Sequence, residues 1–226
     1  MKLVIFDCDG TLVDSQHLIV SAMVTAFERE GLSPPPRETI LSIVGLSLPY
    51  AVAMLVPDLE QARVHAISEG YKRAFGELRL VPGSDEPLYD GMRDILDDIS
   101  AGDETLMAIA TGKSRRGVDR VLQHQRLEGR FVSIHTADNH PSKPHPEMIE
   151  AAMAASGVSA ADTVMVGDTT FDIEMARAAG VRAIGVTWGY HPVDHLIRAG
   201  AHQICETRPD LRQALREFFS SELDPA

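Results

Sequence analysis

Two aspartates near the start of the sequence have a spacing that suits metal binding and phosphoryl transfer. Asp7 and Asp9 follow a short apolar run at residues 3–6 and precede Gly10 and Thr11, which are typical of a tight turn. Carboxylates this close repel each other unless a cation or a shared proton relieves the pair. Mg²⁺ binds one or two protein carboxylates together with phosphate oxygens and water, so the pair favours phosphoryl transfer. The alternative is that both aspartates only stabilise the turn.

A second candidate group follows the apolar run at residues 105–110. Thr111, Gly112, Lys113 and Ser114 come directly after it and precede a helical pattern. A hydroxyl and free backbone N–H groups at the end of a strand, just before a helix begins, are suited to a phosphate oxygen. The alternative is an ordinary Thr or Ser cap of the helix.

Lys143 lies in a loop that prolines restrict. Pro141 precedes it, and Pro144 and Pro146 follow it, so the loop stays rigid and non-helical until the next helix begins. A lysine held in this way can place a positive charge over a transferring phosphoryl group. The alternative is a solvent-exposed loop lysine.

Two more aspartates follow the apolar run at residues 163–166. Asp168 comes after Gly167, and Asp172 lies four positions later, on the same face of the helix that begins there. Asp168 is a candidate second carboxylate for the cation, and Asp172 a candidate for orienting Lys143 or a metal-bound water. Stabilisation of the helix N-terminus is the alternative explanation of this pair.

The elements that would position these groups alternate between strand and helix. Parallel strands joined by helices form a doubly wound sheet, and their carboxyl ends meet at one edge, where ligands bind. We therefore predict an α/β fold with a Rossmann-like parallel sheet, and expect the tail at residues 220–226 to fray. The expected strands are residues 3–6, 105–110, 131–136, 163–166, 182–186 and 203–205, and the expected helices are 91–100, 114–125, 147–155, 171–179 and 211–219.

An all-helical stretch separates the first strand from the rest of this pattern. Helical spacing of apolar residues recurs at 15–30, 37–44, 49–56 and 59–75, and residues 80–87 are rich in turn formers. The sequence thus predicts a core of residues 1–14 and 91–226 and an inserted all-α cap of residues 15–90. Ser15 and the 80–87 segment are the natural hinges between them.

In chain order, the segments DCDGTLVDS, ATGKS, SKPHP and GDTTFD closely resemble the haloacid dehalogenase superfamily. The resemblance extends over nearly the whole chain and is specifically to phosphatases with an α-helical cap, similar to phosphoglycolate phosphatase. It implies that Asp7 is the nucleophile and Asp9 the general acid and base. It further implies that the phosphoryl group is bound by Thr111, Gly112 and Lys143, that Mg²⁺ is held by Asp7, the Asp9 backbone carbonyl and Asp168, and that Asp172 is a supporting carboxylate.

The expected function is a Mg²⁺-dependent phosphatase that hydrolyses a small phosphomonoester, such as phosphoglycolate or a sugar phosphate, through an aspartyl-phosphate. Two alternatives remain: a phosphomutase resembling β-phosphoglucomutase, and a catalytically silent binding protein on the same scaffold. The cap would select the leaving group. Candidate contacts to it are the break Gly45 to Pro49, Arg115, Arg116 and the loop at residues 187–191. The favoured explanations of these features are nevertheless structural: a plain helix connection, a solvated helix face and a Trp188 that covers the core.

The composition sets limits on partners and location. With 226 residues, 44% hydrophobic and 24% charged, the chain fits one domain with an insertion, and its net charge of −12 argues against nucleic-acid or acidic-membrane partners. The two cysteines, Cys8 and Cys205, form no disulfide or metal-thiolate pattern, and we expect Cys8 to point away from the site. The first apolar run is too short for a signal peptide, and no stretch reaches membrane-spanning length. We therefore expect a cytoplasmic monomer or homodimer acting on a small phosphorylated metabolite.

Overall fold

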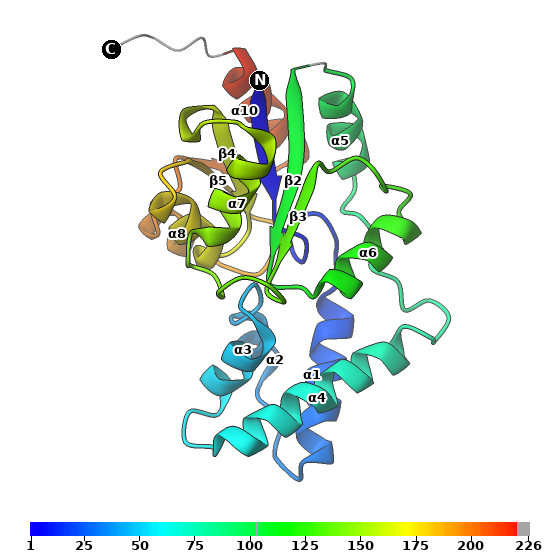
Figure 1. Cartoon of the computed structure of the whole chain (residues 1–226). Helices are drawn as coiled ribbons and strands as arrows, with labels where there is room; N and C mark the ends of the chain where they lie inside the picture. Colours follow the sequence, from blue (N-terminus) through cyan, green and yellow to red (C-terminus); the bar gives the residue numbers. More distant parts are fainter. Residues whose placement is uncertain (103, 221–226) are drawn as a thin grey trace.

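Figure 1 shows a computed structural model of the chain, which describes residues 1–102 and 104–220. A parallel sheet with helices on both faces forms the larger part, and a group of helices lies below the carboxyl ends of its strands. The expectation of a frayed tail falls on residues 221–226, which lie outside the described residues, apart from Ser220, the last residue of a helix. Within the described ranges, no helix has the length and apolar character needed to cross a membrane.

The sheet has six strands, all parallel, in the order β3-β2-β1-β4-β5-β6. The first strand therefore lies in the middle, between the two strands that carry the later polar groups. This arrangement confirms the predicted doubly wound, Rossmann-like α/β fold. The strands are β1 (Lys2–Phe6), β2 (Thr105–Thr111), β3 (Ser133–Thr136), β4 (Thr163–Gly167), β5 (Arg182–Val186) and β6 (Gln203–Cys205).

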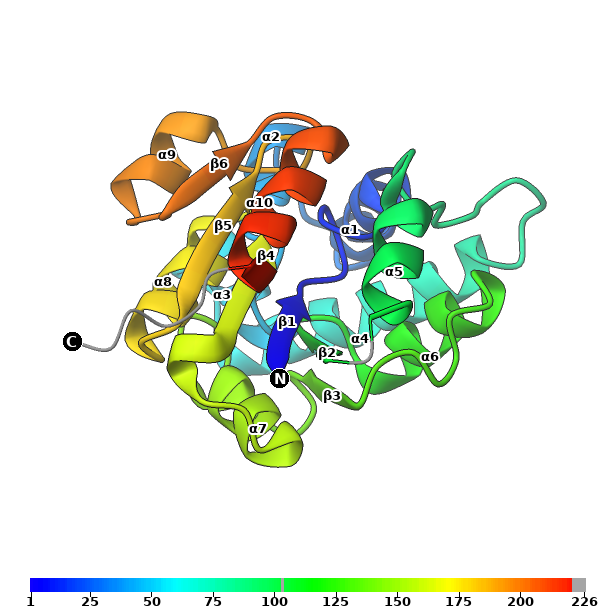
Figure 2. The ribbon, with the colours of Figure 1, turned by 90° about the horizontal axis from the view of Figure 1, so that it is seen from above.

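Helices cover both faces of this sheet, as the view in Figure 2 shows. Side chains of α5 (Met92–Ser100), α6 (Arg115–His124) and α10 (Arg208–Ser220) pack on one face. Those of α7 (Glu147–Ser156), α8 (Thr170–Ala178) and α9 (Val193–Arg198) pack on the other. The central strand β1 has Val4 and Phe6 in the first core and Leu3 and Ile5 in the second, all fully buried. Its continuous apolar run is thus explained by burial on two faces.

We call residues 16–78 the helical lobe. It consists of α1 (Gln16–Arg29), α2 (Arg37–Leu41), α3 (Leu48–Leu55) and α4 (Gln61–Leu78). The lobe has its own apolar core, in which residues of α1 and α4 such as Phe27 and Ile67 are buried together. Two chain connections join the lobe to the sheet: Ser15 before α1, and residues 79–91 between α4 and α5. The carboxyl edge of the sheet faces this lobe (Figure 1).

Several elements differ from the sequence-based expectation. Helix α2 ends at Leu41 rather than residue 44, because the chain turns there toward Gly45, which has a φ of +101° that a helix cannot contain. The loop after β5 contains α9, which was not predicted because its six residues are too few for a clear helical period. Strand β3 begins at Ser133, two residues later than expected.

Candidate active site

Asp7 lies directly after β1 and is fully buried. Its backbone N–H continues the sheet ladder to the carbonyl of Val166 on β4, at 3.0 Å. Lys143 Nζ lies 3.0 Å from Asp7 Oδ1 and 2.5 Å from Asp172 Oδ1, and all three side chains are at most 1% exposed. Lys143 is therefore a buried cation between two carboxylates, not the exposed loop lysine of the alternative interpretation.

The charges in this group change one another's protonation. Burial raises the pKa of Asp7, Lys143 lowers it and Asp172 raises it, with a net pKa of about 6 instead of 3.8. For Lys143, burial lowers the pKa, but the Asp172 and Asp7 carboxylates raise it to a net value above that of an ordinary lysine. Lys143 thus keeps its charge at neutral pH, whereas Asp7 lies close to its titration range.

Asp172 is held by the start of helix α8. Its Oδ2 accepts hydrogen bonds from the backbone N–H of Thr169 at 3.0 Å and from the Thr169 hydroxyl at 2.7 Å, and Thr169 in turn caps the helix. Its Oδ1 is occupied by Lys143. Both oxygens of Asp172 are therefore engaged, which fits the predicted role of orienting Lys143 better than that of a metal ligand.

Asp168, at the end of β4, has neutral partners instead. Its Oδ1 accepts a hydrogen bond from the Thr11 hydroxyl at 2.7 Å, and its Oδ2 accepts one from the backbone N–H of Tyr190 at 2.9 Å. Burial, followed by the Asp172 and Asp7 charges, raises the pKa of Asp168 well above its usual value. Gly10 makes the approach of this carboxylate possible, because it has a φ of +85° and a Cβ there would collide with Asp168.

The arrangement of these carboxylates fits a divalent cation. Asp7, Asp168 and Asp172 each have an oxygen within 4.8 Å of the others, and all three are buried. Within the described part of the chain, neither oxygen of Asp7 accepts a hydrogen bond. A hard cation with oxygen ligands would relieve the repulsion among buried carboxylates this close together, and Mg²⁺ is the simplest such ion.

The segment after β2 forms a second wall of the site. Thr111 is buried, and its hydroxyl accepts a hydrogen bond from the backbone N–H of Lys113 at 3.2 Å. A Cβ at Gly112 would collide with the backbone carbonyl oxygens of Gly45 and Leu46, so only glycine fits between the two loops. The break between α2 and α3 therefore reaches the site from the helical lobe.

Asp9 has a different environment from Asp7. Its Oδ1 accepts a hydrogen bond from the Ser15 hydroxyl at 2.6 Å and is 2.6 Å from Lys113 Nζ. Lys113 Nζ is also 2.6 Å from Glu86 Oε1, and Arg79 Nε donates to Glu86 Oε2 at 2.8 Å. Burial lowers the pKa of Lys113, but Asp9 and Glu86 raise it to a net value above that of an ordinary lysine. Lys113 is thus a permanent cation shared by two carboxylates.

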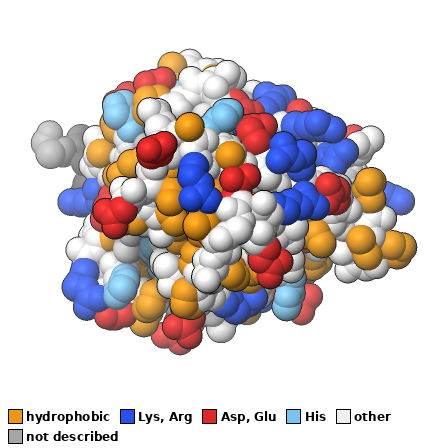
Figure 3. All heavy atoms as spheres, turned by 90° about the horizontal axis from the view of Figure 1, so that it is seen from below, with side chains coloured by type: hydrophobic (Ala, Val, Ile, Leu, Met, Phe, Trp, Pro, Cys, Tyr) orange, Lys and Arg blue, Asp and Glu red, His pale blue; other side chains and the backbone are white. Residues whose placement is uncertain are grey.

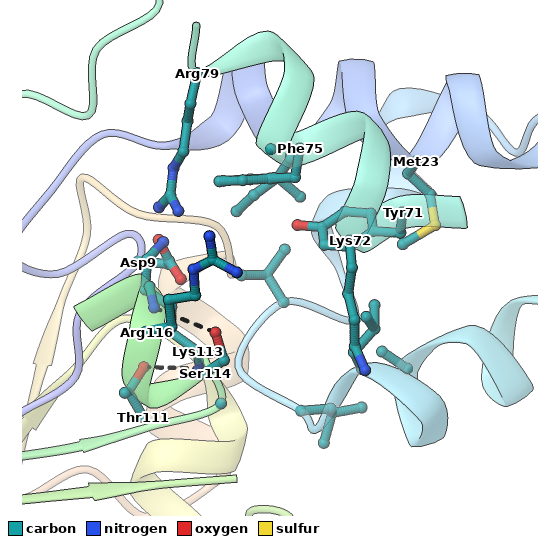
Figure 4. Close-up of a pocket in the computed structure, with 18 of the residues that line it drawn as sticks. Asp9, Met23, Tyr71, Lys72, Phe75, Arg79, Thr111, Lys113, Ser114 and Arg116 are labelled. Carbon is teal, nitrogen blue, oxygen red and sulfur yellow. Dashed lines mark hydrogen bonds and ion pairs between the residues drawn. The ribbon is translucent and has the colours of Figure 1, made fainter. Parts of the chain in front are cut away.

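Asp7 and Asp9 open on a cavity of about 780 Å³ between the sheet and the lobe. Tyr71 and Phe75 line it from α4, and Figure 4 shows Arg116 reaching into it from α6. The neighbouring Arg115 instead pairs with Asp119 on the surface, at 2.8 Å. Figure 3 shows acidic and basic side chains interspersed over the lobe end of the molecule, so an anion approaching this face meets cations despite the net charge of −12.

The structure brings together every residue that the motifs indicated, and adds others. Thr11 and the backbone of Tyr190 hold Asp168, while Glu86 and Arg79 extend the Asp9 group. Trp188, in the same loop as Tyr190, packs against the core and donates to the carbonyl of Thr11 at 3.2 Å. Cys8 is buried in the core beside α5 and α6, and burial and Asp9 raise its thiol pKa, as expected of a residue that faces away from the site.

Several known proteins of similar sequence and structure are named as phosphatases and hydrolases. The family described as haloacid dehalogenase-like hydrolase matches residues 4–186. The chain is 39% identical over 226 residues to the protein named "Probable phosphatase IndB" of Dickeya dadantii, covering 99% of this chain and 97% of that protein. It is 31% identical over 201 residues to a phosphoglycolate phosphatase of Pseudomonas fluorescens, covering 84% and 71% of the two chains. A hydrolase from Pseudomonas syringae has a crystal structure that matches with a TM-score of 0.85 at 25% identity, over 96% and 99% of the two chains.

These matches and the geometry agree. Four motifs predicted a phosphatase of one superfamily, and both the superfamily and the enzyme class are confirmed. The family match begins inside β1 and extends to the end of β5, so it includes each of the four motifs. The chain therefore belongs to the haloacid dehalogenase-like hydrolases.

Proposed function

We propose that this phosphatase is a Mg²⁺-dependent phosphomonoesterase that acts through an aspartyl-phosphate on Asp7. The observation that carries the proposal is the Asp7 carboxylate, which lines the cavity without accepting a hydrogen bond from any described residue and has Lys143 Nζ at 3.0 Å. A carboxylate whose charged neighbour is a single fixed ammonium keeps lone pairs available both to a metal ion and for nucleophilic attack.

Each neighbouring group has a role in this proposal. Asp7, the Asp9 backbone carbonyl and Asp168 would hold the metal, because Asp172 is committed to Lys143 and Thr169. The bound cation would supply Lewis-acid stabilisation of the phosphoryl oxygens. Lys143, the Thr111 hydroxyl and the backbone at Gly112 would bind the phosphoryl group, with Asp172 keeping Lys143 in place.

The proposed reaction consists of two successive displacements at phosphorus. An Asp7 oxygen forms a bond to phosphorus as the ester P–O bond breaks, and Asp9 gives its proton to the departing alkoxide. Asp9, now a carboxylate, then takes a proton from a water molecule, whose oxygen forms a bond to phosphorus as the bond between phosphorus and the Asp7 oxygen breaks. Inorganic phosphate leaves, and both aspartates return to their starting states.

The helical lobe acts as a cap in this proposal, with residues 15–90 inserted into a core of residues 1–14 and 91–226. The cavity accommodates a leaving group the size of glycolate or a sugar, and closure of the lobe would exclude bulk water from the site. The substrate is thus proposed to be a small phosphorylated metabolite. A cytoplasmic location and a monomeric or dimeric state stay predictions.

Phosphate release from a panel of small phosphomonoesters tests this function, with Mg²⁺, with a chelator, and with Asp7→Asn as the blank. We expect metal-dependent release that the variant lacks. The panel should contain 2-phosphoglycolate, several sugar phosphates and p-nitrophenyl phosphate. Isomerised sugar phosphate without free phosphate would instead indicate a mutase, and release that persists in Asp7→Asn would refute the mechanism.

A further inference from the structure

The two oxygens of Asp9 are not equivalent. Oδ1 has two donors, the Ser15 hydroxyl and the Lys113 ammonium, each at 2.6 Å. Among the described residues, none donates a hydrogen bond to Oδ2. An oxygen that accepts hydrogen bonds from an ammonium and a hydroxyl is already occupied, so Oδ2 is the oxygen left to exchange a proton with the substrate. The two donors thus decide which oxygen meets the substrate.

Lys113 is itself held in place by a second carboxylate, that of Glu86. Glu86 Oε1 lies 2.6 Å from its Nζ, and both side chains are less than a tenth exposed. Glu86 is held in turn by Arg79, and its backbone carbonyl accepts a hydrogen bond from Gln125 Nε2 at 2.9 Å. A free lysine beside a phosphate-binding cavity would turn toward the phosphate dianion. Glu86 opposes that movement, because it offers the ammonium a second buried anion away from the cavity.

Asp9 is linked to both connections to the helical lobe, directly through Ser15 and indirectly through Lys113 and its partner Glu86. Ser15 immediately precedes α1, and Arg79 and Glu86 belong to the segment between α4 and α5. Figure 4 shows Lys113 next to Asp9 at the edge of the cavity, with Arg79 extending toward them from the end of α4. The orientation of the Asp9 carboxyl is therefore tied to the position of the lobe on two sides.

We propose that Lys113 and Glu86 are positioning residues for Asp9, which hold its Oδ1 so that Oδ2 faces the leaving oxygen of the substrate. This inference rests on the proposed function, because it takes Asp9 as the group that protonates the leaving alkoxide. When that proton leaves Oδ2, the carboxylate that forms already has an ammonium at its other oxygen.

The dependence of kcat/KM on the leaving group distinguishes a positioning role of Lys113 and Glu86 from a purely structural one. An alkyl phosphate needs the proton of Asp9 when its P–O bond breaks, whereas p-nitrophenyl phosphate releases a stable phenolate without it. The experiment compares kcat/KM for these two esters in the full-length enzyme with Mg²⁺. Lys113→Met, which keeps an unbranched side chain and removes the ammonium, should reduce kcat/KM for the alkyl ester by about 10²-fold, and for p-nitrophenyl phosphate by no more than about tenfold.

Three further variants give this comparison its controls. Asp9→Asn shows the full size of the leaving-group effect. Glu86→Gln retains Lys113 and removes only its anchor, so it should show the same selectivity with a smaller loss, and Glu86→Asp should restore part of it. Lys72→Met removes another cavity-lining ammonium, which pairs with Glu69 at 2.7 Å and does not contact Asp9, so it should affect both esters alike.

The outcomes distinguish the inference from the function on which it rests. Selective loss in Asp9→Asn, Lys113→Met and Glu86→Gln supports the positioning role. Selective loss in Asp9→Asn, with equal loss of both esters in Glu86→Gln and Lys113→Met, overturns that role and leaves the phosphatase mechanism standing. Asp9→Asn without selectivity removes the acid role of Asp9, and the inference with it. Thermal melting of each variant identifies any that fails to fold, and Glu86→Gln then decides in place of Lys113→Met.

Discussion

Asp7 and Asp9 are two residues apart, yet their balancing cations come from different parts of the molecule. Lys143, beside Asp7, belongs to the loop between β3 and α7 and is fully buried with Asp172. Lys113, beside Asp9, borders the cavity and is shared with Glu86, which lies on a connection to the helical lobe. The charged partners of Asp7 thus lie on the sheet and its loops. Around Asp9, Ser15 lies on one lobe connection, and Glu86, which acts through Lys113, lies on the other.

This difference suggests a division of labour. The charged partners of the group that would attack phosphorus all lie outside the lobe. The group that would transfer the proton is instead contacted by Ser15, at one connection to the lobe. A proton donor that is positioned only when the lobe closes over a substrate would protect the intermediate from premature chemistry.

The largest expected effect is that of Asp7→Asn. The amide cannot attack phosphorus, so we expect turnover to fall by at least about 10⁴-fold, while the fold is retained because the amide occupies the same volume. Phosphate release and thermal melting measure the two consequences. Near-normal turnover in this variant would remove the basis for assigning different roles to the two aspartates.

The comparison also predicts unequal losses of stability. Lys143→Met leaves Asp7 and Asp172 buried without their cation, and we expect the free energy of unfolding to fall by about 3–5 kcal/mol in the absence of metal. Lys113→Met leaves Asp9 with Ser15 and Glu86 with Arg79, so a loss of about 1–3 kcal/mol is expected. Urea denaturation at pH 7 with a chelator measures both. Equal losses would show that the two cation sites are energetically alike.

Metal binding should depend on pH through Asp7. Because burial raises the pKa of Asp7 from 3.8 to about 6, the folded, metal-free protein holds a proton that the unfolded chain has already lost in this range. The free energy of unfolding therefore falls as the pH rises from about 4 to 6. A cation that displaces this proton should bind more tightly as the pH rises, by up to about tenfold in affinity per pH unit between pH 5 and 6. Above pH 6 the contribution of Asp7 to the pH dependence of the affinity should level off.

Calorimetric titration with Mg²⁺ in two buffers of different ionisation enthalpy measures this linkage. Proton release should be detected at pH 5 and be much smaller at pH 7.5. The raised pKa of Asp168 acts in the same direction. Asp7→Asn should abolish the part of the pH dependence that belongs to Asp7, and an unchanged dependence in that variant would contradict the assignment.

The residues at the ends of the strands could be predicted from the sequence, because the geometry of a parallel sheet brings them together. Parallel strands end at one edge, so Asp7, Thr111 and Asp168 had to meet once their apolar runs were recognised as strands. The short spacing of prolines around Lys143 identified its loop, and the distance of four residues placed Asp168 and Asp172 together. These inferences need only periodicity and connectivity.

The partners of Asp9 could not be found in this way. Glu86 lies in a segment of turns, where the path of the chain depends on tertiary contacts such as the one between Gln125 and the Glu86 carbonyl. The backbone N–H of Tyr190 reaches Asp168 through a loop with no period, and α9 beyond it is too short to show one. The sequence thus predicts the groups at strand ends and in the proline-restricted loop of Lys143, and misses those in loops that have no such signal.

The smallest expected effect is that of Ser15→Ala, which removes the neutral donor to Asp9 and leaves the charged one. A single hydrogen bond of this kind contributes about 1 kcal/mol, so kcat/KM for an alkyl phosphate should fall only about threefold to tenfold. Tyr190→Phe is the matched control, because the Tyr190 hydroxyl lies 3.1 Å from Ser15 Oγ and does not donate to Asp9. A loss in Ser15→Ala as large as that in Lys113→Met would mean that the two lobe connections act on Asp9 equally. A smaller loss would show that the charged connection dominates, and that the segment carrying Glu86 affects the proton donor more than Ser15 does.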